Sequence, residues 1–274
     1  LLAKHFVVFL FFFTSGIFFY LILKKIIENE NFTKTGTIIY LLYPYLFGQS
    51  LFSPKDIPFM SIWLICTYFS LKLFERLIDK QGISNLNTIF FAFMTSYLLS
   101  IRIAGILIFI QYLATFLIYL SLTNINIFLF LKKFYSNLLI FVFATIFFTI
   151  VFYPELWINP LGVVDVINTM SNHFNNVGTN TYGKIMYSTN LPSTYMLIWF
   201  SVKLPIIIII GICLIPFTEK KIFNSSKRSI YFGSLLISTI LIPLILIFRK
   251  VHLYDELRQV MFLFPLIFII GLVS

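Results

Sequence analysis

Long apolar segments, joined by short polar connections, follow one another along almost the whole chain. A helix needs about 20 mostly apolar residues to cross a bilayer, and in lipid its backbone polar groups have to be paired within a helix or a closed barrel. We therefore predict an all-α fold, a polytopic transmembrane helical bundle of about nine spans. The candidates lie near residues 5–23, 35–50, 57–75, 86–101, 103–122, 134–153, 193–217, 229–248 and 259–274.

The composition excludes a soluble domain. Charged residues make up 11% of the 274 positions and the mean hydropathy is +0.96, whereas a soluble domain carries roughly 25% charged residues. The formal net charge is +10. In a soluble protein such a charge would suggest nucleic acid, but in a membrane protein it indicates loops that face anionic lipid. We expect a lipid bilayer as a partner and no nucleic acid.

No internal repeat or soluble domain interrupts the apolar segments, which predicts a single transmembrane domain over residues 1–274. The longest stretch that is not apolar, residues 154–192, is predicted to be an extracytoplasmic loop with a short interfacial helix near residues 160–171 and a polar, flexible middle from Phe174 to Asn190. The chain begins at Leu1 without Met and stops at Ser274 inside an apolar run. We therefore expect a fragment truncated at both ends.

Lysine and arginine are distributed unequally between the loops. With the N-terminus outside and the spans alternating, the richer side is predicted to be cytoplasmic. That side contains Lys24, Lys25, Lys34, Lys72, Arg76, Lys80, Lys132, Lys133, Lys220, Lys221, Lys227 and Arg228.

The predicted outer face gathers ionisable residues of both signs beside the spanning segments. They are Asp56, Arg102, Glu155, Asp165, His173, Lys184, His252, Asp255, Glu256 and Arg258. An ionisable group in the membrane costs about 2.5–3.5 kcal/mol at a helix centre, which makes these residues functional candidates. Side chains that extend to the interface are the simpler alternative for any single residue, but they explain the recurrence of both signs on one face less well.

Three segments of this face contain the strongest candidates. In the first, Lys55 and Asp56 lie between two prolines at the start of a span, where Asp56 is either a helix cap or a fixed charge at the membrane surface. In the second, His173 lies in the long loop. In the third, Asp255 and Arg258 are three residues apart and would share a helix face, either as a local ion pair or with Arg258 free to bind phosphate.

These segments resemble motifs of bacterial integral-membrane glycosyltransferases of the GT-C superfamily, of the protein-mannosyltransferase and aminoarabinose-transferase kind. Phe47–Phe59 resembles FGHSFxNPKDIPF, and Glu155–Leu161 resembles xLWxNPL. Leu191–Pro205 resembles LPWYYxPxW followed by KTP, and Tyr254–Pro265 resembles YDGWRHxxFxxP. The chain departs from these patterns at Gln49, Ser53, Ser193, Glu256, Leu257 and Gln259.

The resemblance implies a polyprenyl-phosphate-linked sugar as donor, a protein, lipid or glycan as acceptor, and transfer on the extracytoplasmic side of the bacterial inner (plasma) membrane. It also implies that a main catalytic carboxylate lies in a first outer loop that precedes this chain. A divalent cation could assist the phosphate, but no cluster of ligands in the sequence demands a metal or another cofactor.

Substitution at an anomeric carbon needs a carboxylate near the acceptor and cations near the leaving phosphate. We predict that Asp56 is the acidic site residue, that it orients the acceptor or binds a metal, and that Arg258 binds the phosphate. The further substrate-binding candidates are Lys55, Arg102, His173, Lys203, Tyr254 and Asp255, the last as a residue that orients Arg258.

Two other functions stay open. A transporter or flippase of a lipid-linked or amphipathic anion would also need cations near the membrane, although such proteins usually have paired broken helices and internal repeats. A membrane scaffold without catalytic activity would leave the outer-face carboxylates unexplained.

Overall fold

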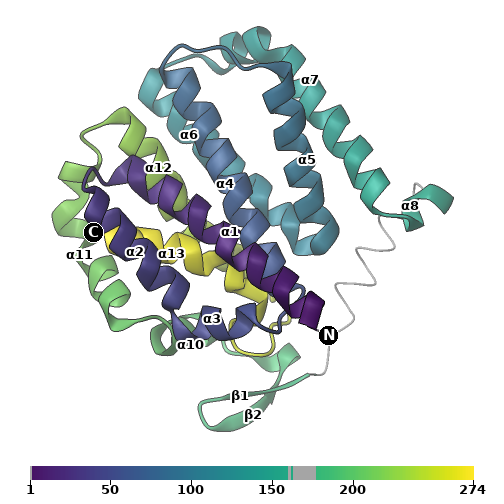
Figure 1. The fold of residues 1–274 in the computed structure, drawn as a ribbon, viewed down its shortest axis with the longest axis vertical. Coiled ribbons are helices and arrows are strands. Elements are labelled where there is room, and N and C mark those ends of the chain that lie inside the picture. Colours follow the sequence, from purple (N-terminus) through teal and green to yellow (C-terminus); the bar gives the residue numbers. More distant parts are fainter. Residues whose placement is uncertain (1, 160–161, 163–176) are drawn as a thin grey trace.

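The computed structural model describes residues 2–159, 162 and 177–274, and it shows a bundle of helices with one small hairpin (Figure 1). The all-α class is therefore confirmed in its main part. The interfacial helix predicted near residues 160–171 lies outside the described residues. The elements are α1 (Leu2–Ile26), α2 (Glu30–Leu42), α3 (Pro44–Ser50), α4 (Asp56–Ile78), α5 (Asn85–Ile101), η1 (Ile103–Leu107), α6 (Ile108–Thr123), α7 (Ile127–Phe152), α8 (Glu155–Ile158), β1 (Gly178–Thr181), β2 (Lys184–Tyr187), η3 (Ser188–Asn190), α10 (Tyr195–Lys203), α11 (Ile206–Ile222), α12 (Ser226–Phe248), η4 (Arg258–Leu263) and α13 (Phe264–Val273).

Five helices of the described chain are long and apolar enough to cross a membrane. They are α1, α4, the continuous segment of η1 and α6, α7 and α12. Helices α10 and α11 would provide a sixth span if they are taken as one bent element, while α5 and the segment of η4 and α13 are apolar but shorter. These helices support the prediction of a membrane protein, whereas the nine predicted spans are not all present as single long helices.

Two of the predicted spans are broken immediately before a proline. The segment near residues 35–50 divides into α2 and α3 at Tyr43, which has an extended backbone (φ −61°, ψ 118°) before Pro44. The segment near residues 193–217 breaks at Leu204 (φ −76°, ψ 141°), and the axes of α10 and α11 differ by 116°. The residue before a proline is biased away from the helical region, which explains both breaks.

The long loop contains a β-hairpin where the sequence analysis predicts flexible polar chain. Strands β1 and β2 are antiparallel, with Gly178 opposite Tyr187 and Thr181 opposite Lys184. The two turn residues Tyr182 and Gly183 both have positive φ (56° and 72°), as a tight two-residue hairpin requires.

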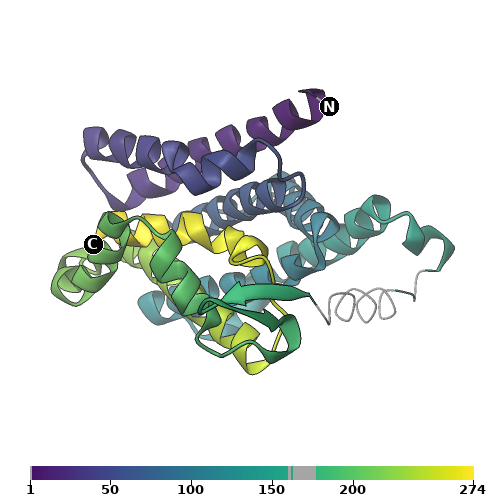
Figure 2. The same ribbon diagram turned by 90° about the horizontal axis from the view of Figure 1, so that it is seen from below.

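Helix α4 forms the centre of the bundle. Of its apolar stretch 78% is buried, against 6% for α7, and α1, α5, α6, α12 and η4 all pack against it. Its Trp63 is fully buried, packs against Phe262 with ring centroids 4.1 Å apart, and donates a hydrogen bond to Oε1 of Gln111 at 2.9 Å. In Figure 2 the purple α1 and α2 form an outer layer on one side of the bundle.

The outward face of α7 is strongly apolar. Phe143, for example, exposes 67% of its surface, and Phe147 next to it is also exposed. A water-soluble protein rarely exposes so continuous an apolar patch, whereas lipid would cover it without cost. The surface of the bundle therefore agrees with its helix lengths in indicating a membrane environment.

The two ends of α4 carry acidic side chains that form ion pairs, Asp56 at its start and Glu75 near its end. At about 1.5 Å per residue, the helix from Asp56 to Glu75 is roughly 28 Å long. This length is close to the hydrocarbon thickness of a bilayer, about 30 Å. Both charged groups can therefore lie at membrane boundaries while the apolar part of α4 lies between them.

Candidate functional site

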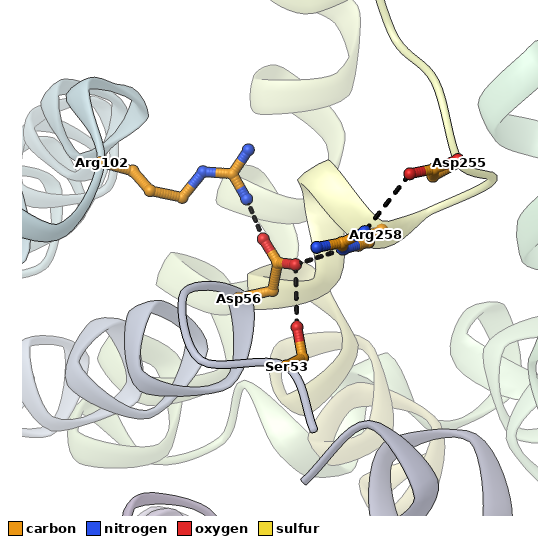
Figure 3. A network of polar contacts seen from close by, with 5 residues as sticks. All are labelled: Ser53, Asp56, Arg102, Asp255 and Arg258. Carbon is orange, nitrogen blue, oxygen red and sulfur yellow. Dashed lines mark hydrogen bonds and ion pairs between the residues drawn. The ribbon is translucent and has the colours of Figure 1, made fainter. Parts of the chain in front are cut away.

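A buried carboxylate at the start of α4 is the centre of a cluster of charged side chains (Figure 3). Only 4% of the Asp56 side chain is exposed. Its Oδ1 accepts a hydrogen bond from Nη1 of Arg102, and its Oδ2 accepts one from Nε of Arg258 at 2.5 Å and one from Oγ of Ser53 at 2.9 Å. Arg258 also donates from Nη1 to Asp255 at 3.3 Å. Segments far apart in the sequence thus meet at one carboxylate.

The start of α4 presents Asp56 to these partners. Pro58 lies in the first turn of the helix, where a proline removes no helical hydrogen bond, and Lys55 is the N-cap residue without a side-chain capping bond. The sequence leaves open whether Asp56 is a helix cap or a presented charge. Since the hydrogen-bond partners of its carboxylate are the side chains of Ser53, Arg102 and Arg258, the structure favours the presented charge.

Arg102 lies at an extended break (φ −152°, ψ 139°) between α5 and η1. The chain turns back on itself at this break and brings Gly105 close to the end of α5. A Cβ atom on Gly105 would lie only 3.0 Å from the carbonyl oxygen of Leu98. The guanidinium group points toward Asp56 (Figure 3) and lies 5.9 Å from the centre of the Phe59 ring, within the range of a cation–π contact. The break and the ring therefore hold Arg102 in place.

The loop before η4 has an unusual backbone conformation. Asp255 and Glu256 are consecutive residues with positive φ (52° and 59°), a conformation that costs a residue other than glycine about 1–2 kcal/mol. It directs the two neighbouring side chains to different cations, because Asp255 pairs with Arg258 and Glu256 pairs with Nζ of Lys203 at 2.6 Å. Backbone strain of this kind is often found at functional sites.

Lys203, at the end of α10, extends the cluster toward aromatic side chains. Its Nζ lies 5.0 Å from the centre of the Tyr45 ring and 5.6 Å from that of Trp199. The phenol of Tyr45 can donate or accept a hydrogen bond.

Three buried polar atoms in the segments that build the cluster have no hydrogen-bond partner among the described residues. They are Oε1 of Gln49, Oε1 of Gln259 and Nε1 of Trp199. Buried polar atoms are normally paired, so these two acceptors and one donor are available to water or to a bound molecule. Gln259 directly follows Arg258, and the Trp199 ring faces Lys203.

An apolar groove of about 430 Å³ has among its lining residues several that are sequence neighbours of the cluster. We call it the α1–α5 groove, and it is lined by Ala3, Lys4, Val7, Val8, Phe11, Pro54, Pro58, Tyr97 and Ile101. Pro54 and Pro58 flank Asp56, and Ile101 precedes Arg102, so the groove reaches the region of the ion pair. Its lining suits an apolar chain, with Lys4 as its one charged side chain.

The cluster contains equal numbers of acidic and basic side chains. Its three carboxylates, from Asp56, Asp255 and Glu256, face three cations, and each guanidinium has N–H donors beyond those that bind Asp56. Guanidinium groups with free donors suit phosphate or carboxylate. Within the described residues no group of three His, Cys, Asp or Glu side chains is placed to hold a metal ion.

The structure brings together four of the predicted site residues, namely Asp56, Arg102, Asp255 and Arg258 (Figure 3), and Lys203 joins them through Glu256. Two further candidates are sequence neighbours of the cluster, since Lys55 is exposed beside Asp56 and Tyr254 precedes Asp255. His173 lies outside the described residues. Two residues of the site were not predicted from the sequence. Ser53 had a signal in its spacing of three residues before Asp56, whereas Tyr45 had none.

A second ionic cluster at the other end of α4 was also missed. Glu75 accepts a hydrogen bond from Nζ of Lys25 at 2.8 Å and another from the hydroxyl of Tyr231 at 2.8 Å. The two further pairs at this end are Lys227–Asp79 and Arg228–Glu28. Together they connect α1, α4 and α12. The distribution of Lys and Arg between the loops carries no information on which carboxylates they pair with.

Comparison with known proteins adds no relative. No protein-family model matches the chain, and neither a curated protein nor a solved structure matches it. The Asp56 cluster, the α1–α5 groove and the motif resemblance are therefore the features that bear on the function.

Proposed function

We propose that this protein is a membrane glycosyltransferase that transfers a sugar from a polyprenyl-phosphate donor to an acceptor. The observation that carries the proposal is the pair of guanidinium groups, Arg102 and Arg258, held by the buried Asp56 beside an apolar groove. A lipid phosphate needs cations next to apolar surface, and this site offers both. The donor chain would lie in the α1–α5 groove and its phosphate at the two guanidinium groups.

The motif resemblance gains support from where its segments lie. Phe47–Phe59 contributes Asp56, Leu191–Pro205 contributes Lys203, and Tyr254–Pro265 contributes Arg258, so three separate motifs meet in one cluster. The motif also has glycine at the position of Glu256. Since Glu256 has a φ of 59°, a conformation that glycine adopts readily, the backbone supplies a physical reason for that preference.

In this proposal the arginines stabilise the leaving group. The acceptor oxygen forms a bond to the anomeric carbon and its proton passes to a base, for which the motif resemblance implies a carboxylate outside this cluster. The bond between that carbon and the phosphate oxygen breaks, and the lipid phosphate leaves with additional negative charge. Preorganised cations lower the free energy of such a transition state. Both oxygens of Asp56 already accept hydrogen bonds, so Asp56 acts as a positioning residue for the arginines rather than as the group that accepts the proton of the hydroxyl.

The Asp56 end of α4 is proposed to face the extracytoplasmic side of the bacterial inner membrane, and the Glu75 end to face the cytoplasm. The cations Lys24, Lys25, Arg76, Lys227 and Arg228 lie at or near the Glu75 end, in agreement with the positive-inside rule. The shorter apolar helices α5 and α13 would then be additional spans in a bundle of about nine.

The test is transfer of label from a panel of radiolabelled polyprenyl-phosphate sugars, with the full-length protein in liposomes and with protein, lipid and glycan acceptors. We expect a labelled product that falls at least 100-fold in Arg258→Ala, since a lost transition-state contact of about 3 kcal/mol has that effect. Arg249→Ala is the matched control, because Arg249 is exposed in the same interhelical segment and forms no ion pair within the described chain. If the Arg258→Ala variant formed as much labelled product as the wild type, the proposed site would be wrong.

A transporter or flippase of a lipid-linked anion is the second candidate, and one observation favours it. The bend of 116° between α10 and α11 is a broken helix of the kind that transporters place at their substrate sites, and Lys203 lies beside it. In the described residues this is the only bent pair that passes as a span, whereas transporters usually have such helices in pairs. Labelled lipid that crosses the liposome membrane without any product would establish this alternative.

A further inference from the structure

A cleft at the Glu75 end of the bundle contains two cations that form no ion pair with any other residue that the structure describes. It lies between α4 and α5, has a volume of about 70 Å³, and is lined by Phe69, Lys72, Leu73, Arg76, Ile83, Asn87, Phe90 and Phe91. Lys72 and Arg76 are one helical turn apart on α4, and Asn87 lines the cleft from α5. From this cleft we infer a binding site for an anionic phospholipid, separate from the Asp56 cluster.

The contrast with neighbouring cations is the main argument. At this end of the bundle Lys25, Lys227 and Arg228 each pair with a carboxylate. Lys72 and Arg76 form no ion pair within the described part of the chain, and Lys72 only lies 5.4 Å above the Tyr68 ring. Like charges four residues apart on a helix repel each other, so an anion between them would remove this repulsion and satisfy both.

The remaining lining identifies the anion as part of a lipid. Aromatic side chains close the cleft, with the rings of Phe69 and Phe90 5.1 Å apart, and 41% of Phe90 is exposed on the outer surface of α5. The neighbouring Leu86 and Ile89 are exposed too. A phosphodiester could bind at Lys72, Arg76 and Asn87 while its acyl chain runs along these side chains, whereas a free phosphate would leave them uncovered.

The chemistry selects the headgroup. Two guanidinium or ammonium groups and one amide donor, with no carboxylate in the lining, attract a phosphodiester without a compensating amine, such as phosphatidylglycerol. A zwitterionic headgroup would bring its own ammonium next to Lys72 and Arg76. We therefore expect discrimination between phosphatidylglycerol and phosphatidylcholine.

The site would connect the two helices that build the Asp56 cluster. Helix α4 runs from Asp56 to the cleft, and α5 runs from the cleft to Arg102. A lipid bound between Arg76 and Asn87 would hold these helices together at the end where their contact contains a cavity. The inference does not depend on the glycosyltransferase proposal, because it needs only a bilayer around the bundle.

The experiment measures lipid binding to the full-length purified protein by native mass spectrometry and by thermal unfolding in nanodiscs of phosphatidylcholine with or without phosphatidylglycerol. A cation near an anionic lipid contributes about fivefold to binding, so Lys72→Gln with Arg76→Gln should weaken phosphatidylglycerol binding roughly 25-fold. Lys132→Gln with Lys133→Gln is the matched control, because these adjacent exposed lysines lie near the start of α7 and should leave binding unchanged.

Three outcomes would overturn the inference: equal binding of the two lipids by the wild type, equal loss in the control variant, and displacement of the lipid effect by inorganic phosphate alone. The charge-preserving exchange of Lys72→Arg with Arg76→Lys guards against misfolding. It should keep at least a third of the wild-type affinity, and a loss as large as that of the glutamine variants, with helix content unchanged, would also contradict a phosphate site.

Discussion

Removal of the Asp56 carboxylate tests the central feature of the structure without any assumption about activity. Asp56→Ala leaves the guanidinium groups of Arg102 and Arg258 facing each other with no anion between them, and it removes the acceptor of the Ser53 hydroxyl. Because the Asp56–Arg102 ion pair is largely buried, water cannot fully replace the lost carboxylate. The substitution should therefore lower the free energy of unfolding.

The magnitude follows from how exposed each partner is. The side chain of Arg102 is 22% exposed and that of Asp56 is 4% exposed. Loss of this largely buried ion pair should therefore cost about 3 kcal/mol of unfolding free energy, the lower end of the range for buried salt bridges. Arg258 is 45% exposed, and solvent screening limits its contribution to about 1 kcal/mol or less. We expect a total loss of about 4 kcal/mol for Asp56→Ala, and roughly half of that for Asp56→Asn, which keeps one acceptor oxygen.

The assay is reversible unfolding of the full-length protein in mixed micelles, monitored by helix content. A double-mutant cycle with Arg102→Gln separates the pair from general packing effects. Once Asp56 has been removed, Arg102→Gln should cost little or should even stabilise the fold, because it removes an unpaired buried charge. The two single losses should therefore exceed the double loss by about 2 kcal/mol or more.

Asp79→Asn provides the comparison for an exposed pair. Asp79 binds Lys227 at 2.8 Å, but both side chains are substantially exposed, so the substitution should cost less than about 1 kcal/mol. If Asp56→Ala costs no more than Asp79→Asn, or if the cycle shows no coupling between Asp56 and Arg102, the cluster does not exist as the structure has it.

Three further substitutions test other parts of the fold. Gln111→Leu should destabilise by about 1–2 kcal/mol, measured by unfolding in micelles, because it leaves the buried Nε1 of Trp63 without its acceptor. Gly211→Ala should cost about 1–3 kcal/mol in the same assay and loosen the contact of α11 with α13, since a Cβ atom there would lie 1.8 Å from the carbonyl oxygen of Gly271. The unfolding free energy of Glu256→Gly should be within about 1 kcal/mol of the wild-type value, because relief of the strain at the positive φ offsets the lost ion pair. Glu256→Val should be at least about 1 kcal/mol less stable than Glu256→Gly.

The helical, apolar character of the fold could be predicted from the sequence because it depends on local composition. Segment length and hydropathy are sufficient to identify α1, α4, α6, α7 and α12 as candidate spans. The breaks before Pro44 and Pro205 were not predicted, although the residue before a proline avoids the helical region and this bias was a signal for both. The hairpin had only a weak signal in Tyr182 and Gly183, because two short polar strands resemble a loop.

The Asp56 cluster could be predicted in part. Asp56, Asp255 and Arg258 were predicted because charges beside apolar segments are costly and because two of them are close in sequence. The pairing of Asp56 with Arg102 and Arg258 bridges 46 and 202 positions of the chain, and no periodicity encodes a contact of that kind. The positive φ values of Asp255 and Glu256 were hidden for a related reason, since both residues normally avoid that conformation and only the surrounding contacts hold them there.

The position of α4 in the bundle depends on its two charged ends, together with the hydrogen bond of Trp63 to Gln111, more than on the apolar side chains of its middle. Apolar surface against apolar surface leaves a helix free to slide or rotate in lipid, because hydrocarbon and leucine are nearly equivalent there. The carboxylate of Asp56 is satisfied only when α5 and η4 bring their arginines to it, and Glu75 only when α1 and α12 bring Lys25 and Tyr231. A shift of one helical turn, about 5.4 Å, would separate the partners at both ends together. The ion pairs therefore fix the depth and rotation of α4, and this fixed position is what holds two arginines beside the α1–α5 groove.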